Sequence, residues 1–311
     1  MPEASIPVTL QSLSDSTIKQ YNKPLRLWWN HCKSKGISMF EAPVPEVLSF
    51  LSSTAESIKT YGTLNSYRSA VSLVLKYDLG NNTMVKRFCK GFSVAKPSRA
   101  KYNDIWDPDN VLRYLDELGP NDQLDLKIIT KKLLTLLSLS TAQRLQTLVK
   151  INIQNIKNCD NELKIYIPDK IKTSKVGKEQ PMLRFPYLHE QPNLCVATLI
   201  KIYLEKTKTI RETGVDSLLF TFKKPHHPAT AQTASRWLKE VMSKSGIDVT
   251  AFAGYSSKHA AVSAAKRKGL DIESIRLAAG WSKTSNVFGK FYNRPLREKC
   301  TFAKTILNYK K

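Results

Sequence analysis

Residues 255–265 read Tyr-Ser-Ser-Lys-His-Ala-Ala-Val-Ser-Ala-Ala, a polar opening that runs into a series of small residues. The alanines predict a helix, with Lys258 and His259 in its first turn. A cation at the N-terminus of a helix opposes the helix dipole. A lysine and a histidine placed there therefore indicate that an anion binds beside them.

Residues 279–295 read Ala-Gly-Trp-Ser-Lys-Thr-Ser-Asn-Val-Phe-Gly-Lys-Phe-Tyr-Asn-Arg-Pro and contain a second group of polar and aromatic residues. Gly280 predicts a tight break, and the indole of Trp281 that follows it can only donate a hydrogen bond. Tyr292 lies near the end of a helix that a proline stops. The alternative for Tyr292 is a core aromatic beside Phe288 and Phe291, but core positions for these two neighbours would leave Tyr292 as the one with a reason to face an anion.

Arg144 lies in a polar break, Ser-Thr-Ala-Gln-Arg-Leu-Gln-Thr-Leu at 140–148, after a long apolar helix predicted from 126 to 139. An arginine flanked by leucines either extends to the surface or serves a site. The local sequence leaves both interpretations open, and by itself favours the surface.

Residues 163–168 and 181–186 have the extended, alternating pattern of two strands. The polar segment between them, 169–180, predicts the turn of a β-hairpin with a basic tip. Lysines at a turn are usually solvated, so local sequence does not separate a solvated turn from a functional one. The lysines of this tip are Lys172, Lys175 and Lys178.

The order of these features along the chain resembles the tyrosine recombinases: an arginine, a hairpin lysine, a His-x-x-Arg-like box, a Gly-Trp box and a tyrosine. The segments 255–265 and 279–295 look most like the recombinases of eukaryotic mobile elements, of the DIRS-like retrotransposon or Crypton kind. The resemblance spans essentially the whole chain. It implies a mainly helical protein with a small β-hairpin or sheet: a helical core-binding (SAM-like) DNA-binding domain at 1–98, a basic linker at 99–108, and a mixed α+β catalytic domain at 109–311.

The resemblance also implies a mechanism and a role for each polar residue. Cations that hold a phosphodiester neutralise the charge that develops in the transition state. Tyr292 would attack phosphorus and leave a 3′-phosphotyrosyl enzyme, without metal, ATP or any other cofactor. Lys172 or Lys175 would protonate the leaving oxygen as general acid. The remaining implied site residues are Arg144 and Lys258 on the scissile phosphate, Trp281 and His259 as donors, and Tyr255 in the box.

Several positions depart from the family pattern, and the interval from Trp281 to Tyr292 is slightly longer than the common one. The usual His-x-x-Arg stands here as Tyr255-x-x-Lys258, and lysine lacks the planar fork with which arginine grips two phosphate oxygens. Thr147 occupies the place of an acidic residue often found shortly after the arginine. We therefore weigh an active site-specific recombinase or integrase against a catalytically impaired or domesticated DNA-binding protein on the same scaffold. A relaxing topoisomerase of the same chemistry is a third hypothesis.

The first hundred residues predict a bundle of short helices with one polar, basic face. Residues 96–107 interrupt the apolar pattern and indicate a linker, or else a long surface loop. The resemblance implies that the two domains close around a DNA duplex. The candidate phosphate contacts in the bundle are Lys59, Arg68, Lys86 and Arg87, although a solvated surface would explain these four residues equally well. The other candidates are Arg99 and Lys101 in the linker and Lys178 at the hairpin tip.

The chain has 49 Lys and Arg against 26 Asp and Glu, a net charge of +23 spread along all 311 residues. Such an excess favours a polyanionic partner, because each cation placed on a phosphate releases a counterion. The alternative is a soluble protein with many solvated lysines. We expect double-stranded DNA as the partner, and the resemblance implies a homo-tetramer on DNA, with the C-terminal segment docking on a neighbouring protomer.

The sequence predicts neither a signal peptide nor a stretch of roughly 20 apolar residues that could span a membrane. Five cysteines are scattered singly, which argues for a reducing compartment and against a disulfide framework or a zinc site. We expect the protein in the nucleus if its host is a eukaryote and otherwise in the cytoplasm, with no metal in its site.

Overall fold

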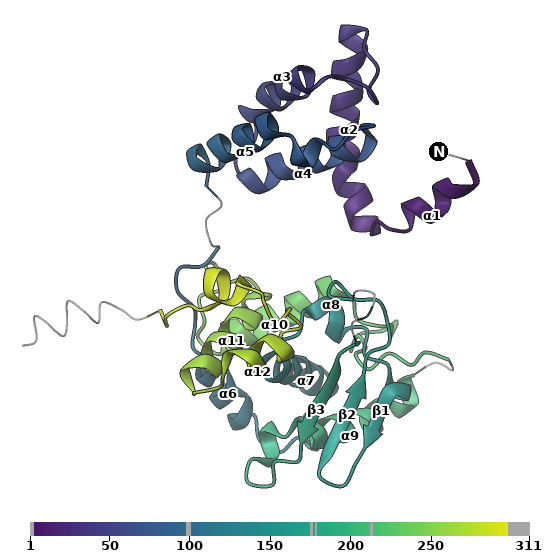
Figure 1. Ribbon diagram of the computed structural model, residues 1–311. Coiled ribbons are helices and arrows are strands. Elements are labelled where there is room, and N and C mark those ends of the chain that lie inside the picture. The colour runs from purple at the N-terminus through teal and green to yellow at the C-terminus, as the bar shows by residue number, and fades with distance from the viewer. Residues whose placement is uncertain (1–2, 98–100, 175–176, 178, 212–213, 298–311) are drawn as a thin grey trace, which may run out of the picture. The chain divides into compact units, whose positions relative to one another are not determined.

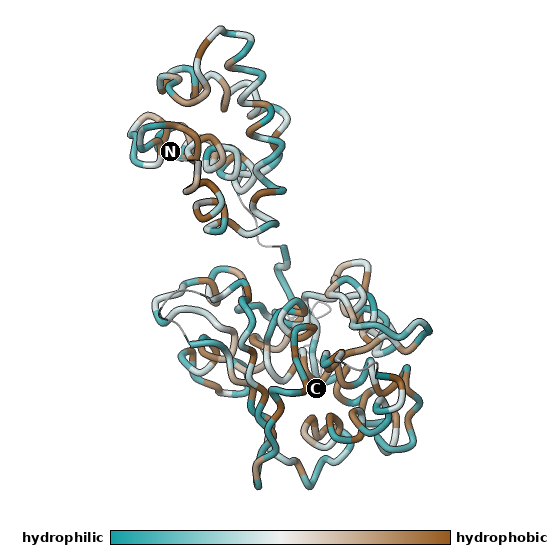
Figure 2. Tube along the Cα trace, turned by 90° about the vertical axis from the view of Figure 1, so that its right-hand side faces the viewer, coloured by the Kyte–Doolittle hydropathy of each residue, from teal (hydrophilic) through white to brown (hydrophobic). Residues whose placement is uncertain are grey.

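The computed structural model describes residues 3–97, 101–174, 177, 179–211 and 214–297. The chain divides into two compact units, residues 1–99 and 100–311, and each has a hydrophobic core of its own. In both units the loops are mostly hydrophilic and the apolar segments concentrate in the helices and strands (Figure 2).

The first unit is a bundle of helices built around Trp28, Phe50 and Leu64, all of them buried. Ser14 accepts a hydrogen bond from the backbone N–H of Thr17 and begins the longest described helix of this unit. The helices are α1 (Ile6–Leu10), α2 (Asp15–Lys35), α3 (Val44–Ala55), α4 (Tyr61–Val74) and α5 (Thr83–Ala95), with α2 and α4 in contact (Figure 1).

The second unit carries a three-stranded antiparallel sheet in the order β1-β2-β3. The predicted hairpin is β2 (Glu162–Tyr166) paired with β3 (Met182–Pro186), and its alternate residues are buried. The third strand, β1 (Ile156–Asn158), was not predicted, because three residues are too few to show an alternating pattern.

Helix α7 (Leu126–Thr141) forms the centre of the second unit, since most of its residues are buried. It contacts helices on several sides, among them α9 (Val196–Thr207), α10 (Ala231–Lys244) and α11 (Ser256–Arg267) (Figure 1). The prediction of a mainly helical protein with a small sheet is therefore confirmed. The other helices of this unit are α6 (Pro108–Glu117), α8 (Leu145–Leu148) and α12 (Ile272–Ala278).

The segment predicted as an interdomain linker is packed into the second unit from residue 101 onward. Tyr102, Ile105 and Trp106 are all buried in the core of this unit. The indole N–H of Trp106 donates to Oγ of Ser256 at 2.8 Å, which fastens the segment to the start of α11. Aromatic and apolar side chains among the basic residues explain the packing, and residues 98–100 lie outside the described part of the chain.

No helix among the described residues is both long and apolar enough to cross a membrane.

Candidate active site

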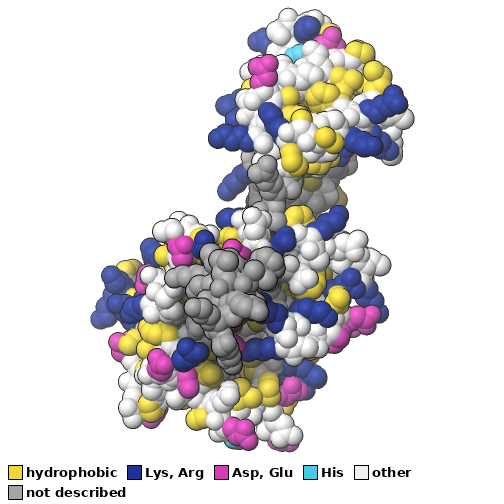
Figure 3. Space-filling view, turned by 90° about the vertical axis from the view of Figure 1, so that its left-hand side faces the viewer, with side chains coloured by type: hydrophobic (Ala, Val, Ile, Leu, Met, Phe, Trp, Pro, Cys, Tyr) yellow, Lys and Arg dark blue, Asp and Glu magenta, His cyan; other side chains and the backbone are white. Residues whose placement is uncertain are grey.

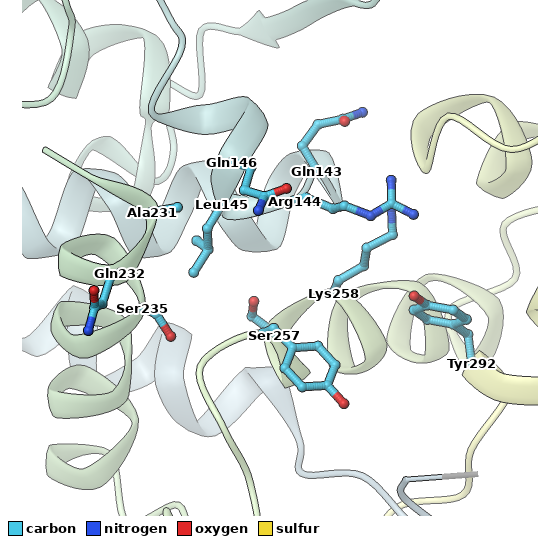
Figure 4. Close-up of a pocket in the computed structure, with 11 residues that line it drawn as sticks. Gln143, Arg144, Leu145, Gln146, Ala231, Gln232, Ser235, Ser257, Lys258 and Tyr292 are labelled. Carbon is cyan, nitrogen blue, oxygen red and sulfur yellow. The ribbon is translucent and has the colours of Figure 1, made fainter. Parts of the chain in front are cut away.

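A cavity of about 390 Å³ opens where the turn after α7 meets the first turns of α10 and α11 and the segment that carries Tyr292. The side chains of Arg144, Lys258 and Tyr292 converge on this cavity from three separate parts of the chain (Figure 4). Its lining residues are Gln143, Arg144, Leu145, Gln146, Ala231, Gln232, Ser235, Tyr255, Ser257, Lys258 and Tyr292.

Arg144 is placed by the abrupt end of α7. Ala142 takes a left-handed backbone conformation with φ +51°, which ends the helix and turns the chain. Gln143 is buried, and its Nε2 donates to the carbonyl of Ala278 at 2.7 Å, which fixes the turn against the end of α12. Arg144 is half-buried and forms no ion pair with a described carboxylate, so its charge is available to an anion.

Lys258 lies in the first turn of α11 with only 4% of its surface exposed. Its Nζ donates to the carbonyl of Ala279 at 2.9 Å and lies 5.2 Å from the ring centre of Trp281. Burial, together with the nearby charge of Arg144, lowers the pKa of Lys258 to about 7. No described carboxylate pairs with this ammonium, and an anion in the cavity would restore its charge.

His259 stacks on the ring of Tyr292, with ring centres 4.0 Å apart and ring planes inclined by 13°. Its Nδ1 lies 3.2 Å from the carbonyl of Phe291, and a carbonyl can only accept, so Nδ1 carries the proton. Burial lowers the pKa of His259 to about 4, which leaves the ring neutral near pH 7. The ring thus holds the segment of Tyr292 by one hydrogen bond and one stack.

Tyr292 ends a π-helical turn, Phe288–Tyr292, and is only partly exposed. Burial raises the pKa of its phenol, whereas the charge of Arg144 favours the phenolate. Its carbonyl accepts a hydrogen bond from Oγ of Ser263 on α11. Three residues after Tyr292, the carbonyl of Pro295 accepts a hydrogen bond from the backbone N–H of Ile105 at 2.9 Å, which holds this segment against the start of the second unit.

Trp281 and the hairpin tip lie beside the same site. The indole Nε1 of Trp281 is buried and has no hydrogen-bond partner among the described residues, so this donor is unused. A Cβ added to Gly280 would lie 3.4 Å from Oγ1 of Thr173, which places the loop between β2 and β3 against the Gly-Trp turn. Lys172 is exposed on this loop, whereas Lys175 and Lys178 lie outside the described residues.

The structure brings together Arg144, Lys258 and Tyr292, with Tyr255 also on the cavity wall. Tyr255 is 42% exposed and has the Nζ of Lys101 4.5 Å from its ring centre. Several polar lining residues were not singled out in the sequence, because single Gln and Ser residues on amphipathic helices resemble solvated positions. They are Gln143, Gln146, Gln232, Ser235 and Ser257.

The candidate DNA contacts of the first unit are mainly exposed. Lys59, Lys86 and Arg87 are exposed, whereas Arg68 is half-buried beside Cys89. Lys and Arg side chains are spread over the visible face of each unit, with fewer acidic ones between them (Figure 3). Arg99 lies outside the described residues, and no group of three or more potential metal ligands occurs among the residues described.

Solved structures share this fold at low sequence identity. The XerH site-specific recombinase bound to a palindromic difH substrate aligns with a TM-score of 0.59 and 13% identity, over 94% of this chain and 79% of that one. The Tn1549 transposon integrase in complex with transposon right end DNA gives 0.59 and 11%, over 97% and 96%. A lambda integrase dimer bound to a COC′ core site gives 0.52 and 14%, over 94% and 93%.

Comparison with protein families covers most of the second unit. No curated protein matches the chain closely enough to count as a relative. The model of the phage integrase family matches residues 107–298, which is more than half of the 311 residues. The match includes the turn of Arg144, the hairpin, the start of α11 and Tyr292. The chain therefore belongs to the phage integrase family.

Proposed function

We propose that this protein is a site-specific DNA recombinase that cleaves and rejoins DNA through Tyr292, in the service of a mobile element. The observation that carries the proposal is the convergence of Arg144, Lys258 and Tyr292 on one cavity. Family membership and the shared fold with DNA-bound recombinases support it. DNA is the substrate that the net charge of +23 favours.

The residues of the cavity suit the chemistry of a phosphodiester. Arg144 and Lys258 neutralise the non-bridging oxygens as charge develops, and the unused N–H of Trp281 supplies a further donor. Tyr292 Oη forms a bond to phosphorus while the bond from phosphorus to the 5′ oxygen breaks. The products are a 3′-phosphotyrosyl link and a 5′-hydroxyl, and reversal of the step on a new 5′-hydroxyl rejoins the strand.

Two proton transfers accompany the step. The phenol of Tyr292 is protonated at neutral pH, so it must release its proton to water in the cavity as it attacks, and the adjacent charge of Arg144 favours that loss. The leaving 5′ oxygen must gain a proton. Lys172 directly precedes Thr173, the residue of the hairpin loop that lies against Gly280. We therefore assign Lys172 as the general acid, with Lys175 as the alternative.

The test is a covalent-trap assay on the full chain. Wild type and Tyr292→Phe are mixed, in EDTA, with nicked duplexes that carry the terminal sequences of the element, and denaturing gels are probed for a protein–DNA adduct. We expect an adduct with wild type and none with Tyr292→Phe, although both bind DNA. An adduct that persists in Tyr292→Phe would refute the assignment of the nucleophile.

A DNA-binding protein that no longer cuts is the second candidate, and the observation that favours it is Lys258 in the position of the usual arginine. Salt-sensitive DNA binding without any adduct would support this candidate. Adduct formation by Lys258→Arg alone would then locate the defect in the lost second hydrogen bond to the phosphate.

A further inference from the structure

A second cavity, of about 440 Å³, lies between α7, α10 and the loop that precedes α10. We call it the basic cleft. Its lining includes the rings of Phe222 and Trp237, whose centres lie 5.1 Å apart. Its lining residues are Lys127, Lys131, Thr221, Phe222, Lys223, Lys224, Pro225, His227, Thr233, Arg236, Trp237 and Glu240.

The charge of the basic cleft is strongly positive and poorly compensated. Glu240 is the one acidic residue in its lining, and it is already paired with the largely buried Lys131. The other lysines and the arginine of the cleft form no ion pair with a described residue: they are Lys127, Lys223, Lys224 and Arg236. Four uncompensated cations around one concave surface repel one another, and an anion between them removes that repulsion.

A smaller cavity of about 150 Å³ adjoins the basic cleft and adds a buried cation. The two cavities share Lys127, Lys131 and Glu240 in their walls. Lys132 lines the smaller one, is fully buried, and has no hydrogen-bond partner for its Nζ among the described residues. Burial lowers its pKa to about 8, although Asp116 opposes this, so a substantial positive charge remains near pH 7.

The basic cleft is distinct from the catalytic cavity. Along α10, Gln232 and Ser235 face the catalytic cavity, whereas Arg236 and Glu240 face the basic cleft. On α7, Lys131 lies ten residues before the end of the helix, which separates it from the turn of Arg144 by about 15 Å. A DNA strand of the same length, about 15 Å, carries roughly four to five phosphates.

We propose that the basic cleft binds the phosphate backbone of duplex DNA several base pairs away from the phosphate held in the catalytic cavity. This inference rests on the proposed function, because that function identifies the polyanion as DNA. Its physical support is charge complementarity: the four uncompensated cations on the concave surface match in sign the regular line of negative charge of a DNA backbone. Contacts of this kind position a duplex and do not read its bases.

The experiment compares two lengths of DNA. Full-length wild type and the triple variant Lys223→Ala/Lys224→Ala/Arg236→Ala are titrated with duplexes that end about three base pairs beyond a nick, or about twenty. A matched control, Lys157→Ala/Lys206→Ala/Lys208→Ala, removes the same charge from exposed positions elsewhere in the second unit. Binding is followed by fluorescence anisotropy over a range of salt concentrations.

We expect the triple variant to bind the long duplex at least tenfold more weakly than the control does, with a salt slope that is shallower by about two to three. On the short duplex the two variants should bind alike. Equal affinities of the triple variant and the control for the long duplex would overturn the proposal.

Two further measurements separate the sources of failure. Adduct formation on the short nicked duplex should survive in the triple variant. An absence of adduct in wild type would contradict the proposed function, but the comparison of affinities for the long and short duplexes would remain a valid test of the basic cleft. Inorganic tripolyphosphate is also titrated into both proteins by calorimetry. If the triple variant loses tight tripolyphosphate binding but keeps its affinity for the long duplex, the cleft binds a small phosphate ligand. That result would overturn the assignment to DNA.

Discussion

Lys258 stands where the resemblance to the tyrosine recombinases implies an arginine, and a lysine at this position makes the site sensitive to pH. An arginine stays charged at any physiological pH, whereas the buried ammonium of Lys258 has a pKa of about 7 before an anion binds. A bound phosphate stabilises the charged form and raises this pKa. Under the proposed function, we therefore expect binding of a DNA phosphate beside Lys258 above pH 7 to draw a proton from solvent.

We expect wild type to take up close to one proton at pH 8 when it binds a nicked duplex, and its affinity to fall as pH rises from 7 to 9. Lys258→Arg should take up none at this position and lose less affinity. Calorimetry in two buffers of different ionisation enthalpy measures the uptake. Identical proton uptake by wild type and Lys258→Arg would show that Lys258 is already charged in the free protein.

His259 contributes to the same site through geometry, because its neutral ring stacks on Tyr292 and its Nδ1 bonds to the carbonyl of Phe291. We expect His259→Phe, which keeps the stack and loses the hydrogen bond, to slow single-turnover adduct formation by about three- to tenfold. His259→Ala should slow it further. DNA affinity should stay within a factor of two in both, and an unchanged rate in His259→Ala would contradict a positioning role.

At the scale of elements, α7 holds the site in place because its buried side chains anchor the turn of Arg144. Its first turn is capped by Asp125, whose carboxylate accepts from the backbone N–H of Ile128 at 2.7 Å. We expect Asp125→Ala to lower the free energy of unfolding of the second unit by about 1 kcal/mol, as measured by urea denaturation. Asp122→Ala, at an exposed position just before the helix, is the control and should change it little.

The segment 101–106 is an element whose role depends on tertiary contacts. Tyr102 meets the ring of His259 edge-on at 5.3 Å, and Trp106 donates to Ser256 at the start of α11. Ile105 also bridges to the chain after Tyr292. These contacts connect the start of the second unit with α11 and with the segment that follows Tyr292, so residues 101–106 support the candidate site as well as joining the units.

At the scale of the whole molecule, the two hydrophobic cores share no residue, and we expect each unit to fold without the other. Residues 1–97 and 101–311, produced separately, should each unfold cooperatively in urea with the helical circular dichroism of their part of the chain. A fragment 1–97 without a cooperative transition would show that the bundle needs the second unit.

Some properties of this protein follow from its sequence alone. The helices and the hairpin are encoded locally, since apolar periodicity, caps such as Ser14 and the alternation of β2 and β3 depend on near neighbours. The order of Arg144, the Lys258 box, Trp281 and Tyr292 was sufficient to suggest a family, and the family model matches. Net charge required no structure.

Only the tertiary structure decided which of these residues share a cavity and what state they are in. Burial, which no local pattern predicts, neutralises His259, lowers the pKa of Lys258 and leaves the N–H of Trp281 unused. The same cause placed the supposed linker in a core, because its aromatic side chains find partners that are distant in sequence. The sequence also could not predict the basic cleft, because its cations come from α7, α10 and the loop before α10, and only folding brings their charges together.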